Sequence, residues 1–186
     1  MICQNPKYIN HYQSPVGGIL LAADETGLTG LWFDGAKYYA AGLDTVQGEK
    51  DTPILERTKE WLAIYFSGRE PDFLPPVHME GTPFQLAVWK ILQKIPYGRT
   101  VTYKEIAREI ASKKNLATMS AQAVGGAVGH NKISIIVPCH RVVGADGSLT
   151  GYAGGIDKKV QLLALEKASA HYDDPNYLPP VFKFLR

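Results

Sequence analysis

The sequence predicts an α/β protein of the α+β type, in which a small sheet-plus-helix domain precedes a mostly helical domain. Short β-branched and aliphatic runs separated by glycines fill residues 12–33, whereas helix caps and helically spaced apolar residues dominate from residue 82 onward. Closely spaced prolines within residues 71–76 mark the join, because proline interrupts both helices and strand ladders. We therefore expect domains at residues 1–76 and 77–171, followed by a tail at residues 172–186.

The composition restricts the class of protein. The chain has 186 residues, 45% hydrophobic and 20% charged, which suits a compact protein and excludes collagenous, low-complexity and mainly disordered chains. Apolar runs are only a few residues long, and we expect no membrane span and no secretory signal. The two cysteines, Cys3 and Cys139, cannot form a dense disulfide framework, so we expect a cytoplasmic protein.

The charge is distributed unevenly along the chain. Residues 1–80 contain 6 basic and 11 acidic side chains, whereas residues 81–186 contain 14 basic and 7 acidic ones. The second part is therefore the better candidate for binding a polyanion such as nucleic acid, although a solvated basic surface without a ligand gives the same count.

The N-terminal part reads as a sheet followed by one helix. Its glycine-punctuated runs within residues 12–33 predict a meander of about three strands. A helix is predicted over residues 53–66, because Pro53 suits a first turn and Gly68 suits a stop. The apolar face of this helix comprises Leu55, Trp61, Leu62, Tyr65 and Phe66.

Three helices are predicted next. Thr82 suits the N-cap of the first, with Pro83 in its first turn and its end at residues 96–98. Thr102 caps the second and forms a capping box with Glu105. The third runs from about residue 120 to residue 129. The apolar face of the first helix comprises Phe84, Val88, Leu92 and Ile95.

The third helix is almost without side chains, although each helical glycine costs about 1 kcal/mol relative to alanine. Close packing against another helix explains such a smooth surface, and so does close approach to a nucleic-acid backbone. Two short helices after a scaffold helix also match a helix-turn-helix. The small residues are Ala121, Ala123, Gly125, Gly126, Ala127 and Gly129.

A cysteine stands beside an imidazole and a guanidinium at Cys139, His140 and Arg141, directly after a buried-strand pattern over residues 133–137 and Pro138. Such a position favours thiolate formation, although a free cysteine is also a common inert core residue. Neighbours in a strand point to opposite faces, so His140 reaches Cys139 only if the chain bends or a water bridges them.

Metal and nucleotide chemistry are not expected. The histidines are scattered and neither cysteine has a partner at ligand spacing, so we expect no metal site. The glycines of residues 124–129 lack the following Lys-Ser/Thr of a phosphate-binding loop.

Several ordered motifs closely resemble the O6-alkylguanine-DNA alkyltransferases, also called methylated-DNA-protein-cysteine methyltransferases. The resemblance spans the second domain and extends to the N-terminal one, and it implies a ribonuclease-H-like sheet domain followed by a winged-helix-like helix-turn-helix. The motifs are Ala123-Val124-Gly125-Gly126-Ala127-Val128-Gly129-His130-Asn131, Pro138-Cys139-His140-Arg141-Val142-Val143, Gly151-Tyr152-Ala153-Gly154-Gly155 and Leu162-Leu163-Ala164-Leu165-Glu166.

This resemblance implies a single-use DNA repair reaction without a cofactor. Cys139 would accept the alkyl group from O6 of guanine and be spent as a thioether. Glu166, on a helix expected near residues 158–168, would hold His140, which would act on Cys139 through a water. Asn131 would fix the loop beside the cysteine, and Tyr103 would donate a hydrogen bond to the departing guanine.

The resemblance also implies the DNA-binding mode. A monomer would bind double-stranded DNA through the minor groove and flip the alkylated base into a pocket. Gln122 stands where many relatives have an arginine, and Lys132 replaces a frequent proline; residues 113–119 form a longer connection. Expected DNA-binding residues are Thr102, Ala121, Gln122, Ala123, Gly125 and Arg141, and expected pocket residues are Val142, Val143, Tyr152, Ala153 and Gly154.

Three other functions compete with this interpretation. A non-catalytic protein that recognises alkylated DNA would lack the acceptor cysteine, whereas Cys139 is present. A regulatory helix-turn-helix protein needs base-reading side chains, which the small residues of the third helix do not supply. A Cys-His hydrolase would turn over repeatedly. The preference among alkyl groups, and between O6-alkylguanine and O4-alkylthymine, stays open.

Overall fold

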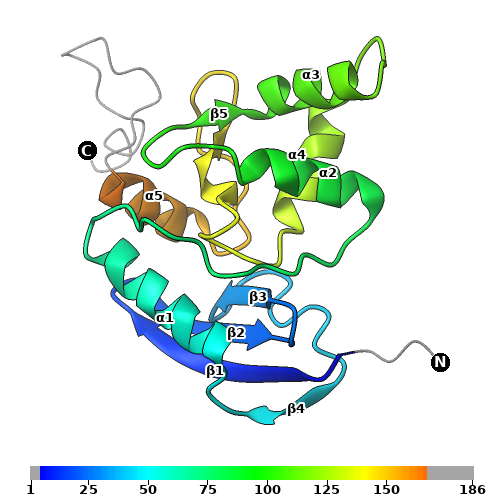
Figure 1. The fold of residues 1–186 in the computed structure, drawn as a ribbon. Helices are drawn as coiled ribbons and strands as arrows, with labels where there is room; N and C mark the ends of the chain where they lie inside the picture. The colour runs from blue at the N-terminus through cyan, green and yellow to red at the C-terminus, as the bar shows by residue number, and fades with distance from the viewer. Residues whose placement is uncertain (1–4, 167–186) are drawn as a thin grey trace.

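The structure, a computed structural model, describes residues 5–166. Cys3 and the predicted tail at residues 172–186 lie outside the described residues. Figure 1 shows a sheet with one covering helix below a cluster of helices, which confirms the predicted α+β class. Among residues 5–166, no helix combines the length and apolarity that crossing a membrane requires.

The sheet has four strands in the order β3-β2-β1-β4. Strands β1 (Lys7–Ser14), β2 (Gly17–Ala23) and β3 (Leu28–Phe33) form the predicted antiparallel meander. Strand β4 (Val46–Glu49) pairs in parallel with β1 and was not predicted, because its mostly exposed residues carry no apolar pattern.

Helix α1 (Pro53–Phe66) lies across one face of the sheet, and its bounds match the prediction. Thr52 caps it by accepting a hydrogen bond from the backbone N–H of Leu55 at 3.3 Å. Leu55, Leu62 and Tyr65 are fully buried beneath the helix. Burial of this apolar face supplies the main stabilisation of the N-terminal part.

The free edge of β3 joins the two halves of the chain. Leu28 exchanges backbone hydrogen bonds of 2.8 Å with Pro76 and His78 on the connecting segment, and Leu31 bonds to Lys132 and Ser134 farther along the chain. The proline-rich join is therefore a strap held against the sheet. Buried residues of both halves form one continuous apolar cluster, so the halves pack as one body.

The helical half follows the predicted caps. Thr82 caps α2 (Pro83–Leu92) and Thr102 caps α3 (Tyr103–Lys113), each within a complete capping box. Helix α4 (Ala121–Gly129) begins after Ser120, as expected. Helix α2 ends at Leu92, before the predicted end at residues 96–98, and Ile95 is buried in the turn that follows instead of on the helix.

Short elements complete the fold around residue 139. Strands β5 (Val101–Thr102) and β6 (Val142–Val143) pair in parallel, and the 3-10 helix η1 (Cys139–Arg141) precedes β6. Helix α5 (Ile156–Leu165) begins two residues before the predicted start and ends with Glu166 as its C-cap.

The strand predicted over residues 133–137 is wrong. The segment forms turns, with a single bridge between Ile133 and Leu31 and a left-handed φ of 67° at Ile135. The Asn131 side-chain amide donates to the carbonyls of both Ile133 and Val137, which curls the segment. Its apolar side chains are buried, as in a strand, but its backbone is held by a polar side chain.

We predict that Gly27→Ala destabilises the protein by about 1–3 kcal/mol. An added Cβ would lie 2.8 Å from the backbone atoms of Val77 and His78, which the β3 edge holds in place. Denaturant unfolding measures the loss. Gly126→Ala is the control: its Cβ meets nothing within 4 Å, so stability should rise by up to about 1 kcal/mol. Equal stability of both variants would contradict this account of the strap.

Candidate active site

Asn131 holds the cysteine loop closed. Its Nδ2 atom donates to Cys139 Sγ at 3.1 Å as well as to the Val137 carbonyl at 2.8 Å, and its Oδ1 atom accepts from the Ile133 backbone N–H at 3.0 Å. The predicted contact between this asparagine and the cysteine is therefore present. Because the side chain is buried, these bonds fix the position of Sγ relative to the loop.

The Cys139 thiol is buried, with 4% of the residue exposed. Burial raises the pKa of this thiol above 9.0, while the Asn131 hydrogen bond and the nearby Lys159 ammonium oppose the rise. The resting protein thus holds a protonated thiol, contrary to the expectation that this position favours a thiolate. A base must take the proton when the sulfur reacts.

His140 follows Cys139 directly in η1 and is the candidate for that base. Its Nε2 atom lies 2.7 Å from Glu166 Oε1, and both side chains are completely buried. An ionised carboxylate only accepts, so Nε2 carries the proton and Nδ1 is left as the acceptor. Within residues 5–166, Nδ1 has no hydrogen-bond partner. Burial lowers the pKa of His140, which keeps the imidazole neutral.

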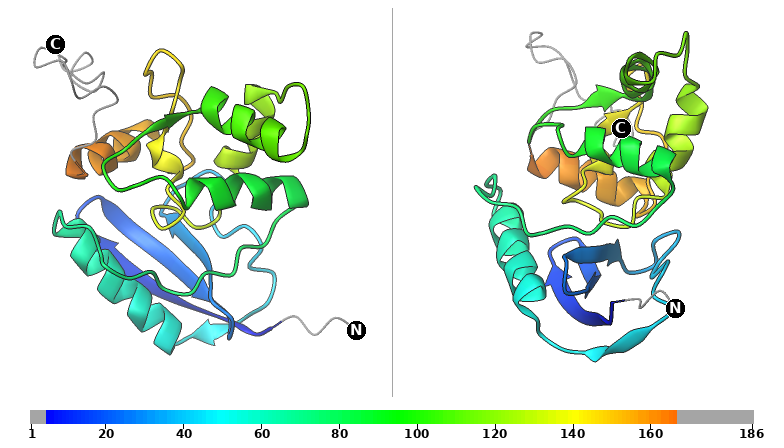
Figure 2. Two further views of the ribbon diagram at one scale, coloured as in Figure 1. Left: turned by 45° about the horizontal axis from the view of Figure 1, so that its top comes forward. Right: turned by 45° about the vertical axis from the view of Figure 1, so that its right-hand side comes forward.

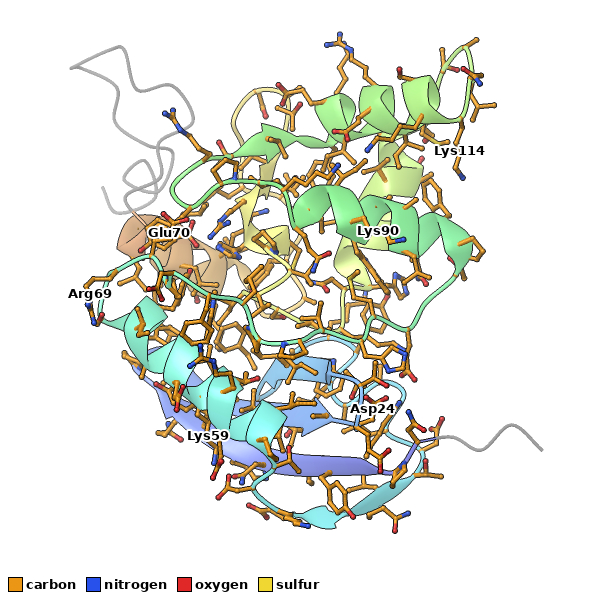
Figure 3. The ribbon with its side chains drawn as sticks, viewed as in Figure 1. Asp24, Lys59, Arg69, Glu70, Lys90 and Lys114 are labelled. Carbon is orange, nitrogen blue, oxygen red and sulfur yellow. The ribbon has the colours of Figure 1, made fainter. Side chains whose placement is uncertain are left out.

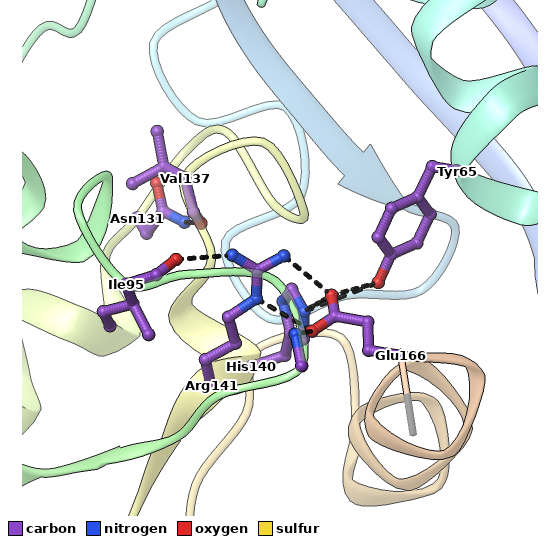
Figure 4. A network of polar contacts seen from close by, with 8 residues as sticks. Tyr65, Ile95, Asn131, Val137, His140, Arg141 and Glu166 are labelled. Atoms are coloured by element: carbon purple, nitrogen blue, oxygen red, sulfur yellow. Dashed lines mark hydrogen bonds and ion pairs between the residues drawn. The ribbon is translucent and has the colours of Figure 1, made fainter. Parts of the chain in front are cut away.

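Glu166 is the centre of the polar network in Figure 4. Besides His140, its carboxylate accepts from Tyr65 Oη at 2.7 Å, from the Gly98 backbone N–H at 3.3 Å and from the guanidinium of Arg141. Despite burial, the hydrogen bonds from His140 and Arg141 and the charge of Arg141 lower the pKa of Glu166 to about 2. The carboxylate is an anion throughout the physiological range.

Arg141 was expected to bind DNA, and the structure corrects this assignment. Only 7% of the residue is exposed. Its Nε and Nη2 atoms contact the Glu166 carboxylate at 2.9 and 3.0 Å, and Nη1 donates to the Ile95 carbonyl at 2.7 Å. Such a paired, buried guanidinium neutralises Glu166 and is not free for a phosphate.

Tyr103 and Lys159 meet at one carbonyl. Tyr103 Oη donates to the Thr150 oxygen at 3.0 Å, and Lys159 Nζ donates to the same oxygen at 3.1 Å and to the Val142 oxygen at 2.6 Å. Lys159 is fully buried, and desolvation lowers its pKa to about 8. Sequence reasoning missed Lys159, because a lysine on an amphipathic helix normally points to solvent.

A cavity of about 280 Å³ lies beside Tyr103, which is one of its lining residues. Of the expected pocket residues, Tyr152 and Ala153 line it; Val142 and Val143 are buried beneath, and Gly154 packs against Tyr152 and Phe33. The N-terminal part also contributes: the Tyr38 ring stacks on His130 at 4.3 Å, and the Lys37 backbone N–H donates to the Ala153 carbonyl. No pattern in the sequence predicts this contribution.

The smooth face of α4 is exposed at the rim of this cavity. Ala121, Gln122 and Ala123 are exposed, and a Cβ added at Gly126 or Gly129 would meet nothing within 4 Å. Helix packing instead uses the buried face, formed by Val124, Ala127 and Val128. The small exposed residues are therefore not required by neighbouring helices. Gly125 faces the Tyr103 ring, and Thr102 is half-buried as the α3 cap.

Several of the lysines of the second half of the chain lie between α2 and α3. Figure 3 shows Lys90 and Lys114 projecting on that side. Together with Lys94 and Lys113 they line a shallow hollow, which is separate from the cavity at α4.

Among residues 5–166 the fold brings together one grouping of possible metal ligands, although none was expected from the sequence. Asp24, His78 and Glu80 place ligand atoms within 4.8 Å of one another. His78 Nδ1 lies 2.6 Å from Asp24 Oδ2, and Lys7 Nζ donates to Glu80 Oε2 at 2.6 Å. These side chains satisfy one another and link the sheet to the strap, so they are explained without a cation.

Taken together, the fold and site define the class of protein that pairs a buried cysteine and an adjacent His–Glu pair with two short helices arranged as in nucleic-acid-binding proteins.

Known proteins are similar to this one over most of the chain. Residues 7–78 match the 6-O-methylguanine DNA methyltransferase ribonuclease-like domain, and residues 83–168 match the DNA-binding domain of the same family. The methylated-DNA–protein-cysteine methyltransferase of Methanosarcina barkeri is 45% identical over 161 residues, which are 86% of this chain and 97% of that protein. Its Haemophilus influenzae counterpart is 40% identical, over 86% of each chain.

Solved structures give the same result. The O6-methylguanine methyltransferase of Mycobacterium tuberculosis superposes with a TM-score of 0.73 at 40% identity, covering 90% of this chain and 96% of that one. The OGT of the same organism, in complex with DNA, also gives 0.73. The chain belongs to the 6-O-methylguanine DNA methyltransferase family.

We predict that Glu166 makes stability fall in acid. Its pKa is lowered from 4.5 to about 2, so its contribution is complete above pH 4.5 and is lost as the pH falls toward 2. The loss should amount to about 3 kcal/mol of unfolding free energy. Denaturant unfolding across this range should show a shallower pH slope for Glu166→Gln, which is also about 3–5 kcal/mol less stable at neutral pH because Arg141 loses its charge partner. Identical slopes would refute the assignment.

Proposed function

We propose that this protein repairs DNA by transferring an alkyl group from O6 of guanine in duplex DNA to Cys139. The observation that carries the proposal is a buried thiol that accepts a hydrogen bond from Asn131 and is followed directly in η1 by His140, which pairs with Glu166. The thiol interacts electrostatically with Tyr103 and Tyr152, which line a cavity bordered by the small residues of α4. Family membership supports the same chemistry. O4-alkylthymine presents a comparable oxygen-linked alkyl group and is the alternative substrate.

The transfer is an in-line displacement. Cys139 Sγ attacks the alkyl carbon, a sulfur–carbon bond forms, and the carbon–O6 bond breaks. The thiol proton passes through a water to His140 Nδ1. The Tyr103 hydroxyl donates a hydrogen bond that offsets the negative charge on the departing guanine, and the guanine anion then takes a proton from solvent water, with the imidazolium returning its proton to solvent. The thioether has no easy leaving group, so each molecule reacts once.

Reaction within a duplex requires base flipping, because stacking and pairing shield O6. We propose that α4 enters the minor groove, where its small residues let the backbone approach closely, and that Gln122 fills the gap left by the flipped nucleotide. The exposed positions of Ala121, Gln122 and Ala123 support this mode. We further propose that the protein acts as a monomer in the reducing cytoplasm, where its thiol stays free.

The direct test uses a duplex oligonucleotide with a single O6-methylguanine. After incubation, mass spectrometry should find one added methyl group per protein, on the Cys139 peptide. Cys139→Ser should gain none, and Cys3→Ser should react like the wild type. Tight binding to the lesion without modification would instead indicate a damage-recognition protein, and repeated release of product would indicate a hydrolase.

Gln122→Arg should strengthen DNA binding about threefold to tenfold at low salt and steepen the dependence of affinity on salt by about one unit of log–log slope. The reason is that arginine adds a fixed charge near the phosphates and a planar fork for the unpaired base. Fluorescence anisotropy with a labelled duplex measures both quantities, with Cys139→Ser as the background to prevent reaction. Unchanged affinity and slope would place Gln122 outside the DNA interface.

A further inference from the structure

We infer that Tyr65, on α1 of the N-terminal part, is a positioning residue for the thiol-activating pair: its hydroxyl holds Glu166 and thereby sets how firmly His140 takes the proton of Cys139. The inference rests on the proposed alkyl transfer. It gives the N-terminal part a direct place in the chemistry, although the sequence of that part offers few reactive side chains.

The contact is direct and fully enclosed. Tyr65 Oη donates to Glu166 Oε1 at 2.7 Å and lies 3.5 Å from His140 Nε2, and Tyr65 has no exposed surface. The two bonded residues are 101 positions apart in the chain. Figure 4 shows the tyrosine reaching the carboxylate from the side opposite Arg141.

The tyrosine ring is held rigidly, so its hydroxyl has little freedom. It stacks on Trp61 with centroids 5.2 Å apart and planes 11° apart. Phe66 and Tyr97 meet it edge-on, at 5.3 and 6.0 Å. A donor fixed in this way restricts the orientation of the carboxylate to which it bonds.

The hydroxyl also changes the electrostatics of His140. Oε1 is shared by Tyr65, His140 and Arg141, so the neutral hydroxyl takes part of the negative charge that would otherwise stabilise an imidazolium. Burial and Glu166 raise the pKa of Tyr65 well above 10.0, and it stays a donor at working pH. Within residues 5–166, the other titratable or charged groups around the pair are Cys139, Lys159, Arg141 and Tyr152. Tyr97 also lies nearby, but burial raises its pKa, so its hydroxyl is neutral at working pH and adds no charge to the pair.

Tyr97 provides a matched control. It belongs to the same aromatic cluster and its ring contacts Tyr65, but within residues 5–166 its buried hydroxyl has no hydrogen-bond partner. Tyr97→Phe and Tyr65→Phe each delete one hydroxyl from the same region and keep the ring. Only the second deletion removes a bond to Glu166.

The experiment measures the second-order rate of methyl transfer from an O6-methylguanine duplex between about pH 5 and 8.5. Loss of the Tyr65 hydroxyl should raise the pKa of His140. The pH at which the methyl-transfer rate falls to half its plateau should therefore be about 0.5–1 pH unit higher in Tyr65→Phe. At pH values below this midpoint the rate should be about threefold to tenfold lower than in the wild type, and the plateau rate at high pH should be nearly unchanged. Tyr97→Phe should keep the wild-type midpoint.

Three results would overturn the inference: an unmoved midpoint in Tyr65→Phe, an equal shift in Tyr97→Phe, or a uniform loss of rate at all pH values, which indicates only looser packing. Nuclear magnetic resonance titration of His140 in free protein gives a second readout that needs no reaction, and the same upward shift is expected. Failure of the proposed function can be told apart from failure of this inference, because Cys139 of the wild-type protein would then gain no methyl group.

Discussion

The buried Glu166 carboxylate is the constraint on which the rest of the site depends. A charge without solvent is tolerated only when donors surround it, and here they come from α1, from the turn after α2 and from η1. Satisfying one anion thus brings three distant segments together. The same bonds orient His140, so the requirement for stability and the requirement for thiol activation are met by one set of contacts.

The burial of the site also sets the resting protonation states of the Cys139 thiol and the His140 imidazole. Burial disfavours charge on both Cys139 and His140, and within residues 5–166 the charged groups that act on them are Glu166, Arg141 and Lys159. A neutral thiol beside a neutral base avoids an isolated buried thiolate until an alkyl group is in place. Such a site keeps a single-use nucleophile unreactive during the search along undamaged DNA.

Much of the fold could be predicted from the sequence because its signals are local. The caps at Thr82, Thr102 and Ser120 bond to residues three positions away, and such bonds leave clear patterns. The turn at residues 133–137 could not be predicted, because the side chain of Asn131 overrides an apolar pattern. Tyr65, Arg141 and Lys159 have roles set by contacts far away in the chain. The roles expected of Cys139, His140 and Glu166 came from family resemblance, and the geometry explains why those residue types suit them.

The central claim is that His140 rests as a neutral imidazole whose proton is on Nε2, with Nδ1 free to take the proton of Cys139. Nitrogen-15 chemical shifts of His140 at pH 7 test this directly, with assignment by comparison to His140→Gln. The account predicts the shifts of a neutral Nε2–H tautomer in the free protein. A doubly protonated imidazolium at pH 7 would contradict the account, because His140 could then not accept the proton of Cys139.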